Sequence, residues 1–230
     1  MRWLRVQLLF FIILLVTAVA IFQTHTRSSK AAFSQAVETS DFEDEVVNEI
    51  NAVRIEPTSA VSYLEKRETL FRGLIMYPPK QTPFLTNEGF PAVEEAIAFL
   101  NKAPKAQSLR ISNGLVKVAK AQLADLLEKP ELGHFGKDGS DLSKRLAKRG
   151  VSGKAAENIT HTPITPRGVT LNMIIDDGVP NRHHRDNVLN PAFRLIGVGC
   201  EKYKNRRYIC VIVFADRFVE GEPSKRIKEY

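Results

Sequence analysis

Residues 195–215 read LIGVGCEKYKNRRYICVIVFA. Two apolar, strand-like runs, 195–199 and 208–215, flank a short polar segment, and this pattern predicts an antiparallel hairpin. The hairpin places Cys200 opposite Cys210. In an oxidising compartment the two sulfurs are expected to form a cross-strand disulfide, the alternative being two free buried thiols. Their spacing matches no zinc ribbon.

Several amphipathic helices precede this hairpin. Apolar residues recur at helical spacing in the segments 42–53, 91–100 and 115–126, and each stripe predicts a helix with one buried face. A further helix is expected at 165–178, because a Thr-Pro pair starts it and a glycine stops it. Residues 155–160 predict one more strand. Helices followed by a terminal hairpin indicate an α+β domain in which helices cover an antiparallel sheet.

Two other segments are predicted to lie at the surface. The segment 71–86 is rich in proline and is expected to be an irregular connection. Ser140 is expected to cap a short helix that Gly150 stops. The cations of this helix are interpreted as a solvated face rather than an anion site. They are Lys144, Arg145, Lys148 and Arg149.

The N-terminus carries the pattern of an export signal. Two arginines precede an apolar run at 6–22. The run is longer than the apolar core of most cleaved signals and slightly shorter than the about 20 residues of a membrane-spanning helix. We therefore expect a secreted or otherwise extracytoplasmic protein, which the run at 6–22 could hold at a membrane. The predicted organisation is a signal peptide or N-terminal membrane anchor at 1–22, a polar spacer at 23–40, a folded domain at 41–219 and a charged C-terminal tail at 220–230.

The net charge of +7 does not indicate a nucleic-acid partner. Residues 1–30 contain four cations and no acid, so the rest of the chain carries only +3. No interleaving of basic and aromatic residues supports nucleic-acid binding either.

Two polar features interrupt the expected pattern. Gln122 falls on the apolar stripe of its helix, so its amide is expected to face either a polar cavity or a structural partner. Asp176 and Asp177 are placed in the last turn of their helix, where the helix dipole disfavours anions. The following segment 182–185, Arg-His-His-Arg, supplies cations that could offset this, the alternative being two solvated acids.

Several motifs in order resemble one family. The quoted segments are GHFGKDGS at 133–140, AENI at 156–159, IDDGVPNRHHRDNVLNP at 175–191 and the earlier Asn51-x-x-Arg54. Together they resemble the CAP superfamily, which comprises cysteine-rich secretory proteins, antigen 5 and pathogenesis-related-1 proteins and is also named for its SCP domain. The resemblance covers roughly residues 42–218 and, because several motifs agree, is specific.

The resemblance implies a three-layer α-β-α sandwich with an open cleft lined by two histidines and two acids. Carried over by motif, these are His134, His184, Glu157 and either Asp177 or Asp176. The sequence departs from the family at Ala156 and His183, where the family usually has Gly, and at Gln122, where close relatives often have another His. The sequon at Asn158 is expected to be unused, because the family buries this segment.

Two chemistries suit such a cleft. His134 and His184 could bind Zn²⁺ or another divalent metal, with the carboxylates as further ligands or as orienting partners. They could instead act as general acid and base, since imidazole titrates near neutral pH. The sequence contains no HExxH or GxSxG motif.

Three functional hypotheses follow. The leading one is a non-catalytic exported module that binds a small apolar ligand, a glycan or a protein partner; the resemblance implies lipid or sterol binding for some members. The second is a metal-dependent hydrolase that uses His134, His184, Glu157 and Asp177. The third is a structural domain of the cell envelope, tethered by an uncleaved N-terminal helix.

Overall fold

The structure is a computed structural model that describes residues 39–162, 165–203 and 207–221. The predicted leader, most of the spacer and the last nine residues of the predicted tail lie outside the described residues. Within the described ranges, no helix is long and apolar enough to cross a membrane.

A four-stranded sheet forms the centre of the fold. Strands β6 (Ala155–Thr162), β7 (Leu195–Tyr203) and β8 (Arg207–Ala215) are antiparallel, and the short β4 (Arg110–Ile111) adds a parallel strand. The spatial order is β4-β7-β8-β6, which leaves β6 at one edge. Cys200 and Cys210 are register partners and form a disulfide. The predicted hairpin and disulfide are therefore confirmed.

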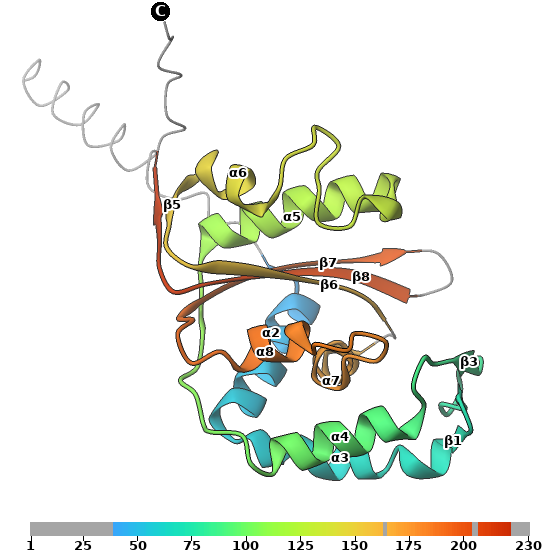
Figure 1. Cartoon of the computed structure of the whole chain (residues 1–230). Helices are drawn as coiled ribbons and strands as arrows, with labels where there is room; N and C mark the ends of the chain where they lie inside the picture. The colour runs from blue at the N-terminus through green and yellow to red at the C-terminus, as the bar shows by residue number, and fades with distance from the viewer. Residues whose placement is uncertain (1–38, 163–164, 204–206, 222–230) are drawn as a thin grey trace, which may run out of the picture. The chain divides into compact units, whose positions relative to one another are not determined.

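Helices cover both faces of this sheet (Figure 1). On one side lie α5 (Asn113–Glu128) and α6 (Leu142–Ala147). On the other lie α2 (Asp41–Ile55), α7 (Pro166–Ile175) and α8 (His183–Leu189), with α3 (Val61–Glu65) and α4 (Phe90–Leu100) packed beyond them. The predicted α+β class and three-layer α-β-α arrangement are confirmed.

Alternation along β8 explains the two separate cores. Cys210, Ile212 and Phe214 pack with the helices of one side, whereas Ile209 and Val211 pack with α5 and α6 on the other. Successive side chains of a strand point to opposite faces, so a continuous apolar run is the expected sequence of a strand covered on both sides.

The glycines of β7 allow α5 to approach the sheet closely. A Cβ atom at Gly197 would lie 2.1 Å from the backbone carbon of Leu115, and one at Gly199 would lie 3.1 Å from the amide of Lys120. Any larger residue at Gly197 would push α5 away from β7.

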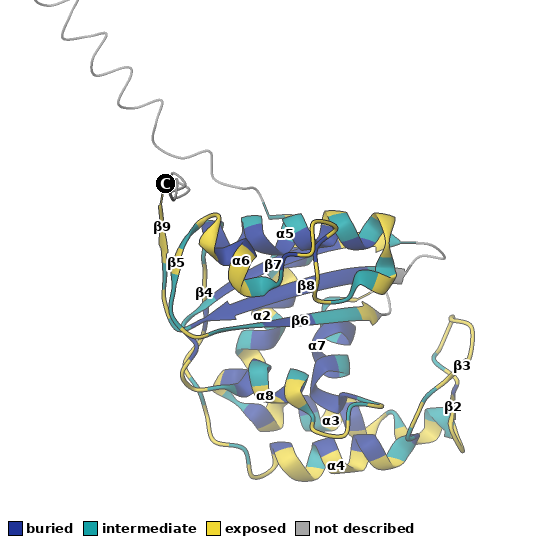
Figure 2. Ribbon diagram, turned by 45° about the horizontal axis from the view of Figure 1, so that its top comes forward, coloured by how far each residue is buried: buried dark blue, intermediate teal, exposed yellow. Residues whose placement is uncertain are grey.

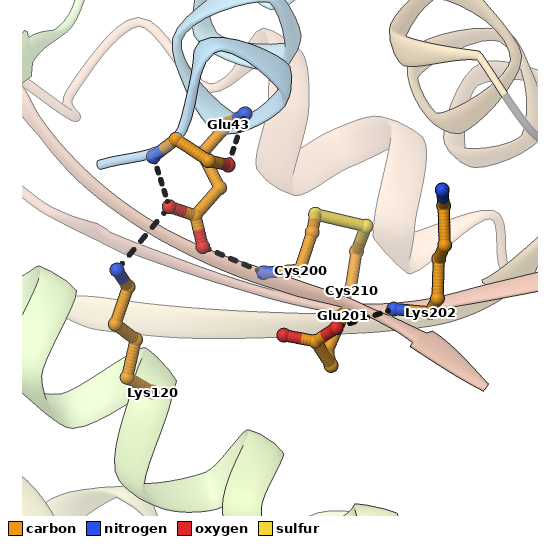
Figure 3. The surroundings of a disulfide bond; sticks show 7 residues. Glu43, Lys120, Cys200, Glu201, Lys202 and Cys210 are labelled. Carbon is orange, nitrogen blue, oxygen red and sulfur yellow. Dashed lines mark hydrogen bonds and ion pairs between the residues drawn. A yellow bond between two sulfur atoms is a disulfide. The ribbon is translucent and has the colours of Figure 1, made fainter.

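Glu43 joins the start of α2 to the disulfide (Figure 3). Its carboxylate, 2% exposed, accepts hydrogen bonds from the backbone amides of Cys200 at 2.9 Å and Ser40 at 2.8 Å. The ammonium of Lys120 on α5 lies 3.3 Å away. One buried carboxylate thus connects a helix of each outer layer to the sheet between them.

Arg54 is the most extensively bonded buried side chain of α2. It is fully buried, and its guanidinium donates to the carbonyls of Gln107, Val188, Asn190 and Phe193 at 2.6–3.3 Å. Burial, together with the charge of Arg194, lowers its pKa to about 10, so it stays charged at neutral pH. Asn51, one turn earlier, exchanges two hydrogen bonds with the backbone of Leu109. The Asn-x-x-Arg motif is therefore a structural clamp.

The expected irregular connection at 71–86 was wrong. It forms a three-stranded antiparallel meander from β1 (Phe71–Arg72), β2 (Ile75–Met76) and β3 (Phe84–Leu85). Figure 2 shows β2 and β3 at one end of the molecule, beside α3 and α4. The inner row of the meander is Phe71, Met76 and Phe84, and the outer row is Arg72, Ile75 and Leu85.

Three local expectations also need correction. Asp141, not Ser140, caps α6, because its carboxylate accepts from the amide of Lys144. Helix α7 ends at Ile175, so Asp176 is its C-cap, in the left-handed conformation at φ 56°, and lies outside the last turn. Arg145, expected in a solvated basic face, is buried because it pairs with a carboxylate of the sheet.

The remaining elements are short. The strands β5 (Gly150–Ser152) and β9 (Phe218–Glu220) pair with each other, and in the described part of the chain three 3₁₀ turns connect longer elements. The turns are η1 (Pro57–Ala60), η2 (Glu68–Leu70) and η3 (Pro130–Leu132).

Replacing Arg54 by Met tests the clamp. We expect the free energy of unfolding to fall by about 3 kcal/mol or more, because each buried carbonyl left without a donor costs about 1–3 kcal/mol. Urea unfolding followed by circular dichroism measures this. Arg110→Met, at an exposed position of β4, is the matched control and should stay within about 0.5 kcal/mol of the parent. Equal losses in the two variants would contradict the clamp.

Candidate functional site

His134 lies in the loop after η3 and is held by a buried ion pair. Its Nδ1 lies 3.0 Å from Oε1 of Glu157 on β6, and Arg145 donates to the other carboxylate oxygen at 2.6 Å. Arg145 also donates to the backbone carbonyls of His134 and Ser140. The Glu157 and Arg145 side chains are 2% and 6% exposed, whereas that of His134 is 51% exposed. The buried pair of Glu157 and Arg145 thus fixes the loop, while the imidazole of His134 remains half-exposed.

Gln122 supports the same loop from α5. Its side chain is fully buried, and Nε2 donates to the carbonyls of Gly133 at 2.6 Å and Phe135 at 3.0 Å, on either side of His134. Its Oε1 has no partner within the described chain. Of the two roles considered for this amide, the structure shows contact with a structural partner.

His184 occupies the first turn of α8 and is held by Asp176. Oδ1 of Asp176 lies 2.6 Å from the imidazole Nδ1, and Oδ2 accepts the His184 backbone amide at 2.9 Å. The left-handed backbone at Asp176 turns this carboxylate back toward α8. Asp177 instead accepts the backbone amides of Asn87 and Glu88, both at 2.8 Å.

Arg182 and Arg185, which flank the two adjacent histidines, bond mainly to glutamates of another segment and to backbone carbonyls, not to the carboxylates of Asp176 and Asp177. Arg182 forms a two-point contact with Glu88, with both distances 2.6 Å, and reaches Glu95 at 2.8 Å. Arg185, fully buried, donates to Glu95 and to backbone carbonyls at the end of α7. Hydrogen bonds from Arg182 lower the pKa of Glu88 to about 2. These contacts fix the start of α8 against α4 and α7.

The segments that carry the two histidines contact neighbouring residues of the same edge strand. Glu157 and Asn158 are consecutive residues of the edge strand β6, so their side chains point to opposite faces. Glu157 contacts His134, and Asn158 donates to the carbonyl of His184 at 3.0 Å. Asn158 is fully buried and also accepts from Asn187, so its amide is inaccessible to a glycosyl transferase in the folded chain.

Two further histidines, His183 and His161, have pKa values below that of a histidine in water. The His183 ring lies 4.3 Å from that of His184, and burial followed by that neighbouring imidazole lowers the His183 pKa. Burial also lowers the pKa of His161 on β6. Both side chains therefore need a lower pH to become charged than a histidine in water does.

A pocket opens beside His184. It has a volume of about 240 Å³, and it lies between the inner row of the meander, α4, α7 and β6. Its apolar lining includes Phe71, Met76, Phe84, Val93, Met173 and Ile175. Its polar lining includes Arg67, His161, Asp176, Asp177 and His184. The pocket therefore combines the His184–Asp176 pair with further polar side chains and with an apolar lining.

A sequence model of the Cysteine-rich secretory protein family (CAP) matches residues 47–214 of this chain. The chain belongs to this family. No curated protein sequence matches the CAP chain. The solved structures similar to it include an extracellular SCP-domain protein from Bacillus anthracis, at 18% identity and a TM-score of 0.39, where the match covers 56% of this chain and 38% of that one.

Two other solved structures are also similar to this chain. An outer surface protein of Borrelia burgdorferi is 22% identical, with a TM-score of 0.39 over 49% of this chain and 80% of that one. Venom allergen-like protein 4 of Schistosoma mansoni is 15% identical, with a TM-score of 0.43 over 81% and 99%.

The CAP domain fits a divalent metal only in part. The Nδ1 atoms of His134 and His184 both face carboxylates. Each imidazole would therefore offer the lone pair of Nε2 to a metal ion, which is how metal-binding histidines are usually oriented. Within the described residues, however, no group of three or more His, Cys, Asp or Glu side chains is arranged to hold an ion. The donor chemistry suits zinc, but the usual third protein ligand does not come from these residues.

A double-mutant cycle tests how His134 is held. Arg145→Met should lower the free energy of unfolding by about 3–5 kcal/mol, because it leaves the Glu157 carboxylate buried without its cation. Adding Glu157→Gln should recover much of the loss. Urea unfolding of the two single variants and the double variant measures this. If the two effects simply add, the pair does not act as a unit.

Proposed function

We propose that this CAP chain is an exported binding module that holds a small, largely apolar ligand in the pocket beside His184. The observation that carries the proposal is the pocket lining. Apolar side chains from the meander, α4, α7 and β6 line it together with polar side chains, among them Arg67, His161 and His184. Ligand sites commonly combine apolar walls with a small number of polar groups that set orientation.

The pocket size limits the ligand. Its volume of about 240 Å³ is well above what a single ordered water needs, so it can hold part or all of a small molecule. A longer chain would extend through the mouth. The apolar lining also favours such a molecule over a glycan, whose hydroxyl groups would lose hydrogen bonds to water.

Export is proposed from features outside the pocket. The leader at 6–22 lies outside the described residues, and its sequence is that of a signal peptide or anchor. The Cys200–Cys210 disulfide suits an oxidising compartment. Either a released or a tethered domain would keep the pocket in that compartment.

Filling the pocket tests the proposal. Val179 lines the pocket and is partly exposed, so Val179→Phe should occupy the space without entering the core. We expect the affinity for 1-octanol, measured by calorimetry, to fall by about tenfold or more. Val151→Phe, on the exposed β5 and 70% exposed, is the control and should bind as the parent does. Equal affinities of the parent and Val179→Phe for 1-octanol would contradict the proposal.

A second candidate function is weak binding of a divalent cation. It is favoured by the matching arrangement of His134 and His184, each with Nδ1 held by a buried carboxylate. In this proposal the two Nε2 atoms would hold the ion, and it would supply Lewis-acid chemistry of the kind that the hydrolase hypothesis requires. The absence of a third described ligand makes binding weaker than at a structural zinc site.

Calorimetry with Zn²⁺ tests this second candidate. The double variant His134→Ala, His184→Ala should bind the ion at least about tenfold more weakly than the parent. His161→Ala, which keeps both candidate ligands, should leave the affinity unchanged. Equally tight binding by the double variant would place any zinc site elsewhere.

A further inference from the structure

Arg67 lies on the pocket wall, between α3 and the meander. It precedes η2, and its side chain lines the pocket together with Phe71 and Phe84. It is partly buried, and burial alone lowers the pKa of its guanidinium to about 10. At neutral pH the group is therefore still a cation, in a partly buried position on the pocket wall.

No described residue pairs with this cation. The other shielded arginines all have partners: Arg54 donates to four carbonyls, Arg145 bonds Glu157, and Arg185 bonds Glu95. For Arg67, no hydrogen bond, ion pair or ring contact of the guanidinium exists within the described chain. Even partial burial of a charge is unfavourable when the charge is unpaired, and Arg67 lies on the wall of a pocket.

The acids of the pocket are already committed. Asp176 bonds the imidazole and amide of His184, and Asp177 bonds the amides of Asn87 and Glu88. Neither contributes to the pKa of Arg67. The pocket thus offers an unpaired cation at one position and satisfied carboxylates at another, with apolar side chains such as Met76 and Met173 also lining it.

We propose that Arg67 is the specificity-determining residue of the pocket and pairs with an anionic group of the ligand. This inference rests on the proposed function. The ligand class is a small amphiphile with one carboxylate or similar anion at one end and an apolar chain behind it. The planar guanidinium matches a carboxylate in a two-point contact, which a neutral alcohol cannot form. The apolar chain would lie against the inner row of the meander.

A pair of probes that differ only in the head group tests this. We compare octanoate with 1-octanol at pH 7 by calorimetry, using the full chain in nanodiscs of zwitterionic lipid and subtracting empty nanodiscs. The parent should bind octanoate at least about tenfold more tightly than 1-octanol. Arg67→Gln should bring the octanoate affinity down to that of 1-octanol. Arg72→Gln, on the exposed outer row of the same meander, is the matched control and should keep the preference.

The outcomes separate this inference from the proposed function. If the parent binds neither probe, the pocket does not serve as proposed. If it binds both equally, or if Arg67→Gln keeps the preference, the pocket binds apolar ligands and the role of Arg67 is wrong.

Thermal unfolding without ligand gives an independent readout. Arg67→Met removes an unpaired cation, so we expect Tm to rise by about 2–4 °C, and added octanoate should stabilise the parent but not this variant. A lower Tm for Arg67→Met would show that Arg67 supports the fold, and would overturn the inference.

Discussion

The buried guanidinium of Arg54 is the constraint on which the arrangement of this CAP domain most depends. Its carbonyl partners come from the segment before β4, from the end of α8 and from the turn into β7. A buried cation without these partners would be unfavourable, so the three segments and α2 can be ordered only together. Since α8 carries His184 at its other end, a residue remote from the pocket helps to set the position of its wall.

The same principle recurs around both histidines. Arg145 and Glu157 fix the His134 loop, and Arg185 with Glu95 fixes α8 against α4 and α7. Buried charges that are fully paired make loops rigid at a cost in desolvation. Arg67 differs because it is only partly buried and no described residue pairs with its charge, which the proposal assigns to the ligand.

Much of the fold could be predicted because its signals are local. The stripe at 115–126 and the apolar run of β8 gave correct elements, and the hairpin gave the disulfide. The meander was missed because each of its strands has two residues, too few for alternation to be visible. The burial of Arg145 was missed because its partner, Glu157, lies on a strand that only the tertiary fold brings near. The choice between Asp176 and Asp177 depended on a left-handed residue that no motif indicates.

The contact between Glu43 and Cys200 lies at an edge of the central sheet that no further strand covers in the described chain. Cys200 and Cys210 have Cα atoms 4.2 Å apart, the spacing of a non-hydrogen-bonded pair, so the Cys200 amide points away from β8. Beyond Ile196, β7 has no other strand neighbour in the described chain, and such a margin is a template for pairing with another molecule. Glu43 already accepts from this amide, so the amide is not available as a donor to an incoming strand. The start of α2 thereby closes one hydrogen-bonding position at the exposed edge of the hairpin.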